Sequence, residues 1–170
     1  MPRLDYTAPD HEVTERIRQR RGGRLTALDG VLLHSPEFAD GWNSMLRAVR
    51  ERSTLPADLR EAVILRVAAI NGADYEWAAH QPIARAAGLT DADIDAIGSG
   101  DPLDSLLGAA VRYAEVMTRD VTVPDEIFDA IRDSLDDQQV LELTVTIATY
   151  NMVSRLLVAL DVSAEDTIQL

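Results

Sequence analysis

The chain has 170 residues, a hydrophobic fraction of 46% and a formal net charge of −13. This length suits one domain over residues 1–170 with a substantial core, and the composition is that of a globular rather than a disordered protein. The excess of acidic side chains argues against a non-specific nucleic-acid binder, because phosphate contacts need clustered Lys and Arg.

Membrane and export signals are also missing from the sequence. No apolar run approaches the roughly 18 residues of a membrane span, and the N-terminus lacks the apolar core of a signal peptide, so we expect a cytoplasmic protein without a membrane partner. The chain has no cysteine, which excludes disulfides, thiolate metal sites and cysteine-based peroxidase chemistry.

The first third of the chain predicts three helices. A charged helix over 11–21 ends at two glycines, and leucines at helical spacing indicate a second over 25–33. Ser35 as a cap and Pro36 at the first position predict a third helix, running to about residue 52. The arginine-rich run 16–24 fits a solvated helix end with favourable charge, and an anion-binding site is the alternative.

The middle of the chain predicts a core helix and a proline-containing helix. Residues 56–72 carry an apolar face and end in glycine, which indicates a core helix. Residues 74–87 form the next helix, in which Pro82 predicts a kink or a break near 78–81.

The remaining residues continue the helical pattern. A short helix starts near Thr90, with Asp93 completing a capping box, and a long one lies within 101–120. A short helix over 125–134 precedes a long apolar one over about 136–160, which we expect to be buried. Strand signals are nearly absent, so we predict an all-α fold of about eight helices.

Glu76 and His80 are the first candidates for chemistry. They lie four residues apart in the helix over 74–87, so they share a face and can touch. Such a pair can transfer protons, or it can be an ordinary helical ion pair, which is the simpler reading from spacing alone. A metal site at Glu61, Glu76 and His80 is less favoured, since no metal-binding histidine motif occurs. We therefore predict no metal and no cofactor.

A family resemblance rests on the segment "LREAVILRVAAINGADYEWAAHQPIARAAGLTDADI". It resembles the core motif of the carboxymuconolactone decarboxylase family, which includes alkyl hydroperoxidase D. Peroxidase members of that family have a Glu twelve residues before a CxxC motif and a His four residues after its second Cys. Here Glu61 and His80 match the Glu and the His, while Ala73 and Glu76 stand at the cysteine positions.

The resemblance is firmest over residues 55–97, and "IATYNMVSRLLVAL" is also typical of some members. It implies an alkyl hydroperoxidase D-like all-α domain that forms homotrimers or homohexamers with active sites near subunit interfaces. Because both cysteines are replaced, peroxidase activity through a thiol is not expected.

The resemblance then favours a cofactor-free lyase for a small carboxylated lactone or related cyclic acid. In this hypothesis His80 is the proton donor, Glu76 orients it and Glu61 supports the pair. Side chains that could contact the substrate are two arginines, for its carboxylate, and three aromatics, as an apolar wall: Arg66, Arg85, Tyr75, Trp77 and Trp42.

Several alternatives stay open. Arg66 also fits a buried structural pair with Glu61 or another acid, and the three aromatics also fit the core. The protein as a whole could be a non-catalytic oligomer that binds a small acidic or aromatic ligand. An isomerase or a hydrolase would need the same proton transfers as the lyase.

Overall fold

The computed structural model describes residues 2–163, and over that range the chain forms nine α-helices and no strand. The predicted all-α fold is confirmed, with nine helices where about eight were expected. In chain order they are α1 (Glu12–Arg20), α2 (Ala27–Leu32), α3 (Pro36–Glu51), α4 (Ala57–Asn71), α5 (Asp74–Ala86), α6 (Asp91–Ser99), α7 (Ser105–Arg119), α8 (Asp125–Arg132) and α9 (Asp137–Ala159).

Local sequence signals set most of the helix ends. Pro36 lies in the first turn of α3, and the Thr90 hydroxyl and the Asp93 carboxylate form the predicted capping box of α6. Gly72 ends α4 in the left-handed conformation, with φ of 64°, which a residue without a Cβ adopts at little cost. The Ser35 side chain makes no capping hydrogen bond, so at that end only the proline signal acted as expected.

Of the kink or break predicted near residues 78–81, the break was wrong, because α5 runs without interruption from Asp74 to Ala86 with Pro82 inside it. A proline removes one backbone hydrogen bond from a helix but does not forbid it when packing holds both sides. Here Glu76 and His80 before the proline and Ala84 after it are all buried against the rest of the protein. Tertiary contacts therefore hold both halves of α5 as one helix.

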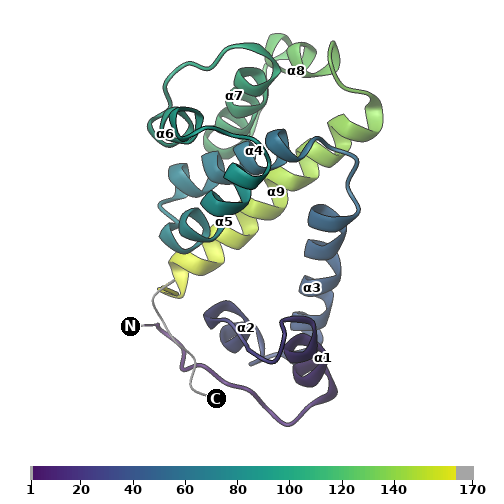
Figure 1. Ribbon diagram of the computed structural model, residues 1–170, viewed down its shortest axis with the longest axis vertical. Coiled ribbons are helices and arrows are strands. Elements are labelled where there is room, and N and C mark those ends of the chain that lie inside the picture. Colours follow the sequence, from purple (N-terminus) through teal and green to yellow (C-terminus); the bar gives the residue numbers. More distant parts are fainter. Residues whose placement is uncertain (1, 164–170) are drawn as a thin grey trace.

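The centre of the protein is formed by α4 and α9, which pack against each other (Figure 1). Helix α4 also packs against α5, α6 and α7, so it is buried on every side over Leu59–Ala68, Arg60 excepted. Burial of this kind is the main stabilising contribution, at roughly 25 cal/mol per Å² of apolar surface removed from water. The β-branched run in α9 remains helical because that helix lies within this core.

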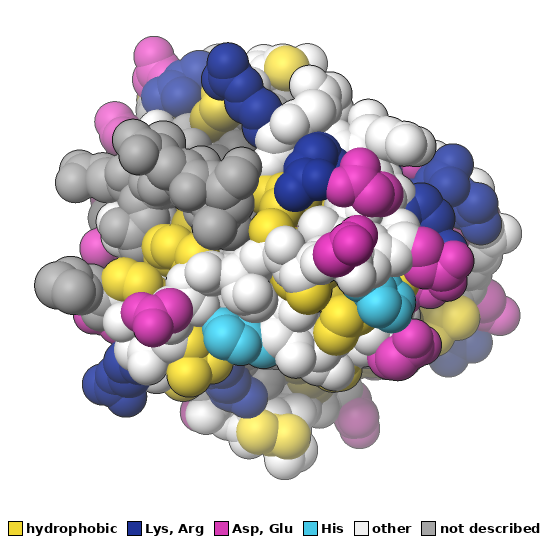
Figure 2. Space-filling view, turned by 90° about the horizontal axis from the view of Figure 1, so that it is seen from below, with side chains coloured by type: hydrophobic (Ala, Val, Ile, Leu, Met, Phe, Trp, Pro, Cys, Tyr) yellow, Lys and Arg dark blue, Asp and Glu magenta, His cyan; other side chains and the backbone are white. Residues whose placement is uncertain are grey.

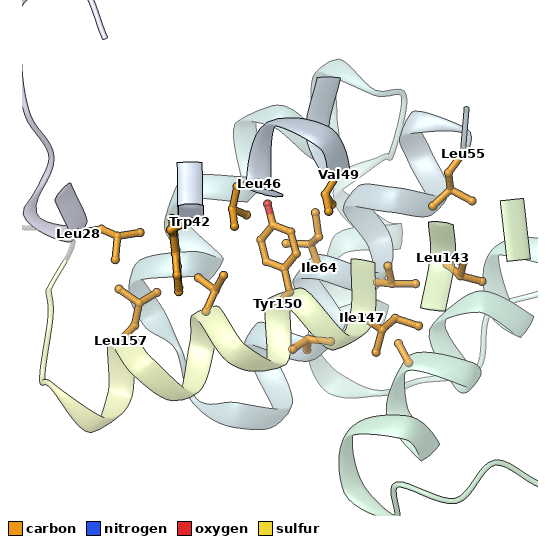
Figure 3. Packing of buried hydrophobic residues seen from close by; sticks show 14 of the residues in the cluster. Leu28, Trp42, Leu46, Val49, Leu55, Ile64, Leu143, Ile147, Tyr150 and Leu157 are labelled. Atoms are coloured by element: carbon orange, nitrogen blue, oxygen red, sulfur yellow. The ribbon is translucent and has the colours of Figure 1, made fainter. Parts of the chain in front are cut away.

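The helices α1, α2 and α3 form one end of the molecule, next to α9 (Figure 1). Trp42 and Leu46 of α3 join the main core there, and Leu28 of α2 packs with them. Figure 3 shows Tyr150 standing on α9 among these side chains, close to Leu46. A second, smaller apolar cluster lies between α4, α5, α6 and α7.

Seen from the end formed by α1 and α2, acidic and basic side chains are mixed, with apolar ones between them (Figure 2). The described residues on this face therefore do not separate into an acidic and a basic region. Within the described residues 2–163, no helix is both long and apolar enough to cross a bilayer.

Candidate active site

A pocket of about 220 Å³ lies where α3, α5, α9 and the connection between α1 and α2 meet. We call it the site pocket. Glu76 and His80 of α5 line it together with Arg50 of α3 and Tyr150 of α9, while leucines and a valine supply apolar wall. Residues more than 60 positions apart in the sequence thus share one small cavity.

His80 is held by Glu61 rather than by Glu76. Its Nδ1 lies 2.7 Å from the Glu61 carboxylate, which comes from the neighbouring helix α4. Burial, together with the charges of Arg50 and Arg60, lowers the pKa of His80, although the hydrogen bond and charge of Glu61 oppose this. Burial also tends to raise the pKa of Glu61, but the hydrogen bonds and charges of His80 and Arg60 outweigh it and lower that pKa. A neutral imidazole therefore donates its Nδ1–H to an ionised carboxylate.

This tautomer leaves Nε2 of His80 as an acceptor, and the Tyr150 hydroxyl lies 3.2 Å from it. The hydroxyl donates to Nε2 and accepts a hydrogen bond of 2.6 Å from Nε of Arg50, whose guanidinium also lies 5.6 Å from the ring centre of Tyr150. Burial raises the pKa of Tyr150, so the phenol stays protonated. Arg50, Tyr150, His80 and Glu61 form one continuous hydrogen-bonded chain.

Glu76 occupies a different environment from the one the sequence suggested. Both of its carboxyl oxygens are buried without a hydrogen-bond partner among the described residues, and the residue is only 2% exposed. Burial raises the pKa of Glu76 to about 9, although the nearby charge of Arg50 opposes this. The contact expected between Glu76 and His80 is therefore not formed among the described residues, where the imidazole bonds to Glu61 instead.

The two predicted substrate arginines lie outside the site pocket. Arg66 is buried on another side of α4, where it forms an ion pair of 3.2 Å with Glu115 and donates to the Ile97 carbonyl at 3.0 Å. Arg66 therefore forms the buried structural ion pair that was the alternative to substrate binding, with Glu115 as the acid. Arg85 is half exposed on α5 and pairs with Asp91 at 2.7 Å.

Of the three aromatics, only Tyr75 lines the site pocket. Trp77 packs into the second apolar cluster, against Gly98 of α6. Trp42 is buried in the main core with its ring 5.9 Å from that of Phe38. The core interpretation therefore describes the tryptophans better than a substrate wall does.

Sequence reasoning missed Arg50 and Tyr150. Tyr150 had one usable signal, since it is a hydrogen-bonding aromatic in the middle of an apolar helix and such groups need a partner when buried. Arg50 had none, because it reads as one of several charged residues on α3.

The carboxylates and the histidine do not assemble into a metal site. Over residues 2–163, no group of three or more potential ligands is arranged to hold a metal ion. Glu61 and His80 bond to each other, and Glu76 has no hydrogen-bond partner among the described residues.

The site residues lie in a segment with a known family pattern. Residues 36–116 match the Carboxymuconolactone decarboxylase family. This part of the chain belongs to that family. The match covers Glu61, Glu76, His80 and Arg50 but not Tyr150. No curated protein matched the chain.

Solved structures show that the chain has the alkyl hydroperoxidase D-like fold. An uncharacterized peroxidase-related protein from Silicibacter sp. TM1040 is 19% identical, with a TM-score of 0.81 over 95% of this chain and 91% of that one. The alkylhydroperoxidase AhpD core of Ralstonia eutropha JMP134 is 18% identical, with a TM-score of 0.81 over 97% and 93%.

A third neighbour is the debrominase Bmp8, solved in complex with 2,3,4-tribromopyrrole. It is 16% identical, with a TM-score of 0.79 over 97% of this chain and 94% of that chain. At such identities the likeness concerns the fold. This protein differs from a thiol peroxidase in a basic respect, since it contains no cysteine.

Proposed function

We propose that the protein is a cofactor-free lyase that decarboxylates a small carboxylated lactone or a related cyclic acid by proton transfer. The observation that carries this proposal is the buried carboxyl of Glu76, which has no hydrogen-bond partner within residues 2–163 and lies in the wall of a pocket that also contains Arg50. Burial raises the pKa of this carboxyl to about 9. An acid that keeps its proton at neutral pH, next to a cation, suits the protonation of a carbanion formed from an anionic substrate.

The reaction needs no group beyond these side chains. The bond between the ring and the substrate carboxylate breaks, carbon dioxide leaves, and the electron pair moves into the ring as an enolate. Arg50 stabilises the negative charge, and Glu76 gives its proton to the ring carbon. The Glu76 carboxylate then takes a proton from water, so one proton is consumed for each carbon dioxide released.

His80 takes a different part from the one first expected. Its pKa is lowered and its Nε2 accepts from Tyr150, so it has no proton to give on the pocket side. We assign Glu61, His80 and Tyr150 as positioning residues that hold Arg50 at the pocket through the Tyr150 hydroxyl. The acid is Glu76.

The volume of the site pocket supports a single-ring substrate. At about 220 Å³ it is smaller than the roughly 300–1,000 Å³ of pockets for drug-sized ligands. The pyrrole in the debrominase structure is also a small ring compound. Apolar walls from α2 and α9 suit the faces of such a ring.

Turnover tests this proposal directly. Carboxylated lactones and β-keto acids are screened by ultraviolet absorbance and carbon dioxide release. Glu76→Gln keeps the shape of the protonated acid and should lower kcat by about 10²- to 10⁴-fold. Glu37→Gln, at an exposed position on α3, is the matched control. Full turnover by the Glu76 variant would contradict the assignment.

His80→Gln tests the positioning role. Losing the Glu61–His80–Tyr150 chain should raise KM and lower kcat together, while circular dichroism shows an intact fold. A wild-type protein that binds these acids without turning any of them over would favour the alternative, a non-catalytic binding protein.

We also propose that the protein associates with itself, as a homotrimer or homohexamer. Leu141 and Val145 lie one turn apart on α9 and are 62% and 40% exposed, so they form an apolar strip that association would cover. Light scattering coupled to size-exclusion chromatography tests this, and a monomer at micromolar concentration contradicts it.

A further inference from the structure

A groove lined by four arginines lies between α1 and α3, on the outside of the protein. Arg16 and Arg20 come from α1, Arg47 from α3 and Arg52 from the residue that follows α3, and the groove has a volume of about 450 Å³. We call it the arginine groove. In a chain with a net charge of −13, such a concentration of cations is unusual.

Two of these charges have no acidic partner among the described residues. Arg16 pairs with Asp40 at 2.8 Å and Arg47 with Glu51 at 3.0 Å. Arg20 instead donates to the neutral amide of Asn43, and Arg52 forms no ion pair with a described carboxylate. The pKa of Arg20 is lowered by burial and by the charges of Arg21 and Arg50, as expected where cations are crowded.

A small pocket lies between the arginine groove and the site pocket and shares lining residues with both. It has a volume of about 50 Å³, and we call it the passage. It shares Arg20 and Arg47 with the groove and Arg21, Leu28 and Arg50 with the site pocket, and Glu51 also lines it. Cationic side chains therefore follow one another from the outer surface to the residue that touches Tyr150. Elsewhere on this end of the molecule, acidic and basic side chains are mixed (Figure 2).

We propose that the arginine groove and the passage are the entrance through which a small carboxylate reaches the site pocket. Arg20 and Arg52 attract the anion, which the negative charge of the whole chain would otherwise repel, and Arg50 receives it at the inner end. This inference rests on the proposed function for the anionic nature of the substrate. It adds a route and two residues that set the rate of binding.

The test measures association of benzoate, with benzamide as a neutral probe of nearly the same shape. Trp42 borders the passage, and it is the only tryptophan left in a Trp77→Phe background. Its fluorescence in stopped flow, with ligand-observed exchange NMR as a second readout, gives the association rate constant.

Two double variants and one single-substitution control are compared in that background. Arg20→Gln with Arg52→Gln removes the unpaired charges, and the corresponding double Lys variant restores charge without the guanidinium. Arg112→Gln removes an exposed arginine from α7, outside the groove. The three substituted arginine positions are exposed, so these changes should retain the fold of the background protein.

At an ionic strength of about 10 mM, the double Gln variant should bind benzoate about three- to tenfold more slowly than the Arg112 control. The difference should vanish at about 0.5 M salt, where the Debye length is only a few ångströms. The double Lys variant should match the control, and benzamide should be unaffected.

Equal benzoate rates in all variants, an equal slowing of benzamide, or no binding of benzoate to the protein would each overturn the entrance. The proposed function fails separately, since it depends on turnover and on Glu76. Salt-dependent benzoate binding without any turnover would leave the entrance standing alone. Turnover with equal rates in all variants would leave only the proposed function.

Discussion

The buried carboxyl of Glu76 should make the protein less stable as the pH rises, and removing this carboxyl should remove its contribution to the pH dependence of stability. The pKa of Glu76 is raised from 4.5 to about 9 by burial. Between these values the folded protein keeps a proton that the unfolded chain has lost, so folding takes up a proton and the free energy of unfolding falls as pH increases. The effect is complete only above the folded pKa.

The magnitude follows from the size of the shift. One pKa unit corresponds to about 1.4 kcal/mol, so at about pH 7.5, three units above the ordinary value, Glu76 costs about 4 kcal/mol. This is a large part of the roughly 5–15 kcal/mol that stabilises a typical domain. Between about pH 5.5 and pH 8 the wild type should lose about 1.4 kcal/mol per pH unit relative to a variant without the carboxyl.

Urea unfolding at several pH values, followed by circular dichroism, measures this slope. Glu76→Gln and Glu76→Met both remove the ionisable group, one with a polar and one with an apolar side chain, so a shared change in slope reports the proton and not the packing. Glu37→Gln serves as the exposed control. Parallel curves for wild type and both Glu76 variants would refute a protonated carboxyl at this position.

Three further outcomes are expected from the contacts. Tyr150→Phe removes the hydroxyl between an imidazole and a guanidinium and should lower the free energy of unfolding by about 1–3 kcal/mol in urea, with a clear fall in kcat/KM. Glu142 accepts hydrogen bonds from the residues before α4 and from Gln138, which outweigh burial and hold its pKa at about 2. Glu142→Gln should cost about 1–3 kcal/mol near neutral pH, and this difference should disappear as the pH falls from about 4.5 towards 2. Gly100→Ala should lower the melting temperature, whereas Gly41→Ala should not. Gly100 has a positive φ of 85°, and a Cβ there would lie 2.6 Å from the Arg66 guanidinium, while Gly41 has neither feature.

The spacing of Glu76 and His80 predicted one shared helix face, because one helix turn is a local property. Both lie on α5 and line the site pocket. The resemblance placed Glu61 near the pair, but the direct bonds of His80 to Glu61 and Tyr150 were not predictable from local spacing. Glu61 lies 19 residues from His80 in the sequence and Tyr150 lies 70 residues away, so these contacts depend on how α4 and α9 pack against α5.

The substrate-binding residues show the same limit. Arg66 and Arg85 lie within the motif segment, but on a helix nearby residues point in different directions. Arg66 turns to Glu115 and Arg85 to Asp91, while Arg50, outside the motif, reaches the site pocket. Sequence proximity was therefore a poor guide to the lining of the site pocket.

The sequence by itself determined the helices, most of their ends, the family pattern at Glu61, Glu76 and His80, and the absence of thiol chemistry. Those features follow from apolar spacing, capping residues and composition, which act over a few residues. Only the tertiary structure decided that Glu61 holds His80 and that Glu76 keeps a proton. Both depend on burial and on partners from distant helices, because a pKa is set by the surroundings in space and not by neighbours in the chain.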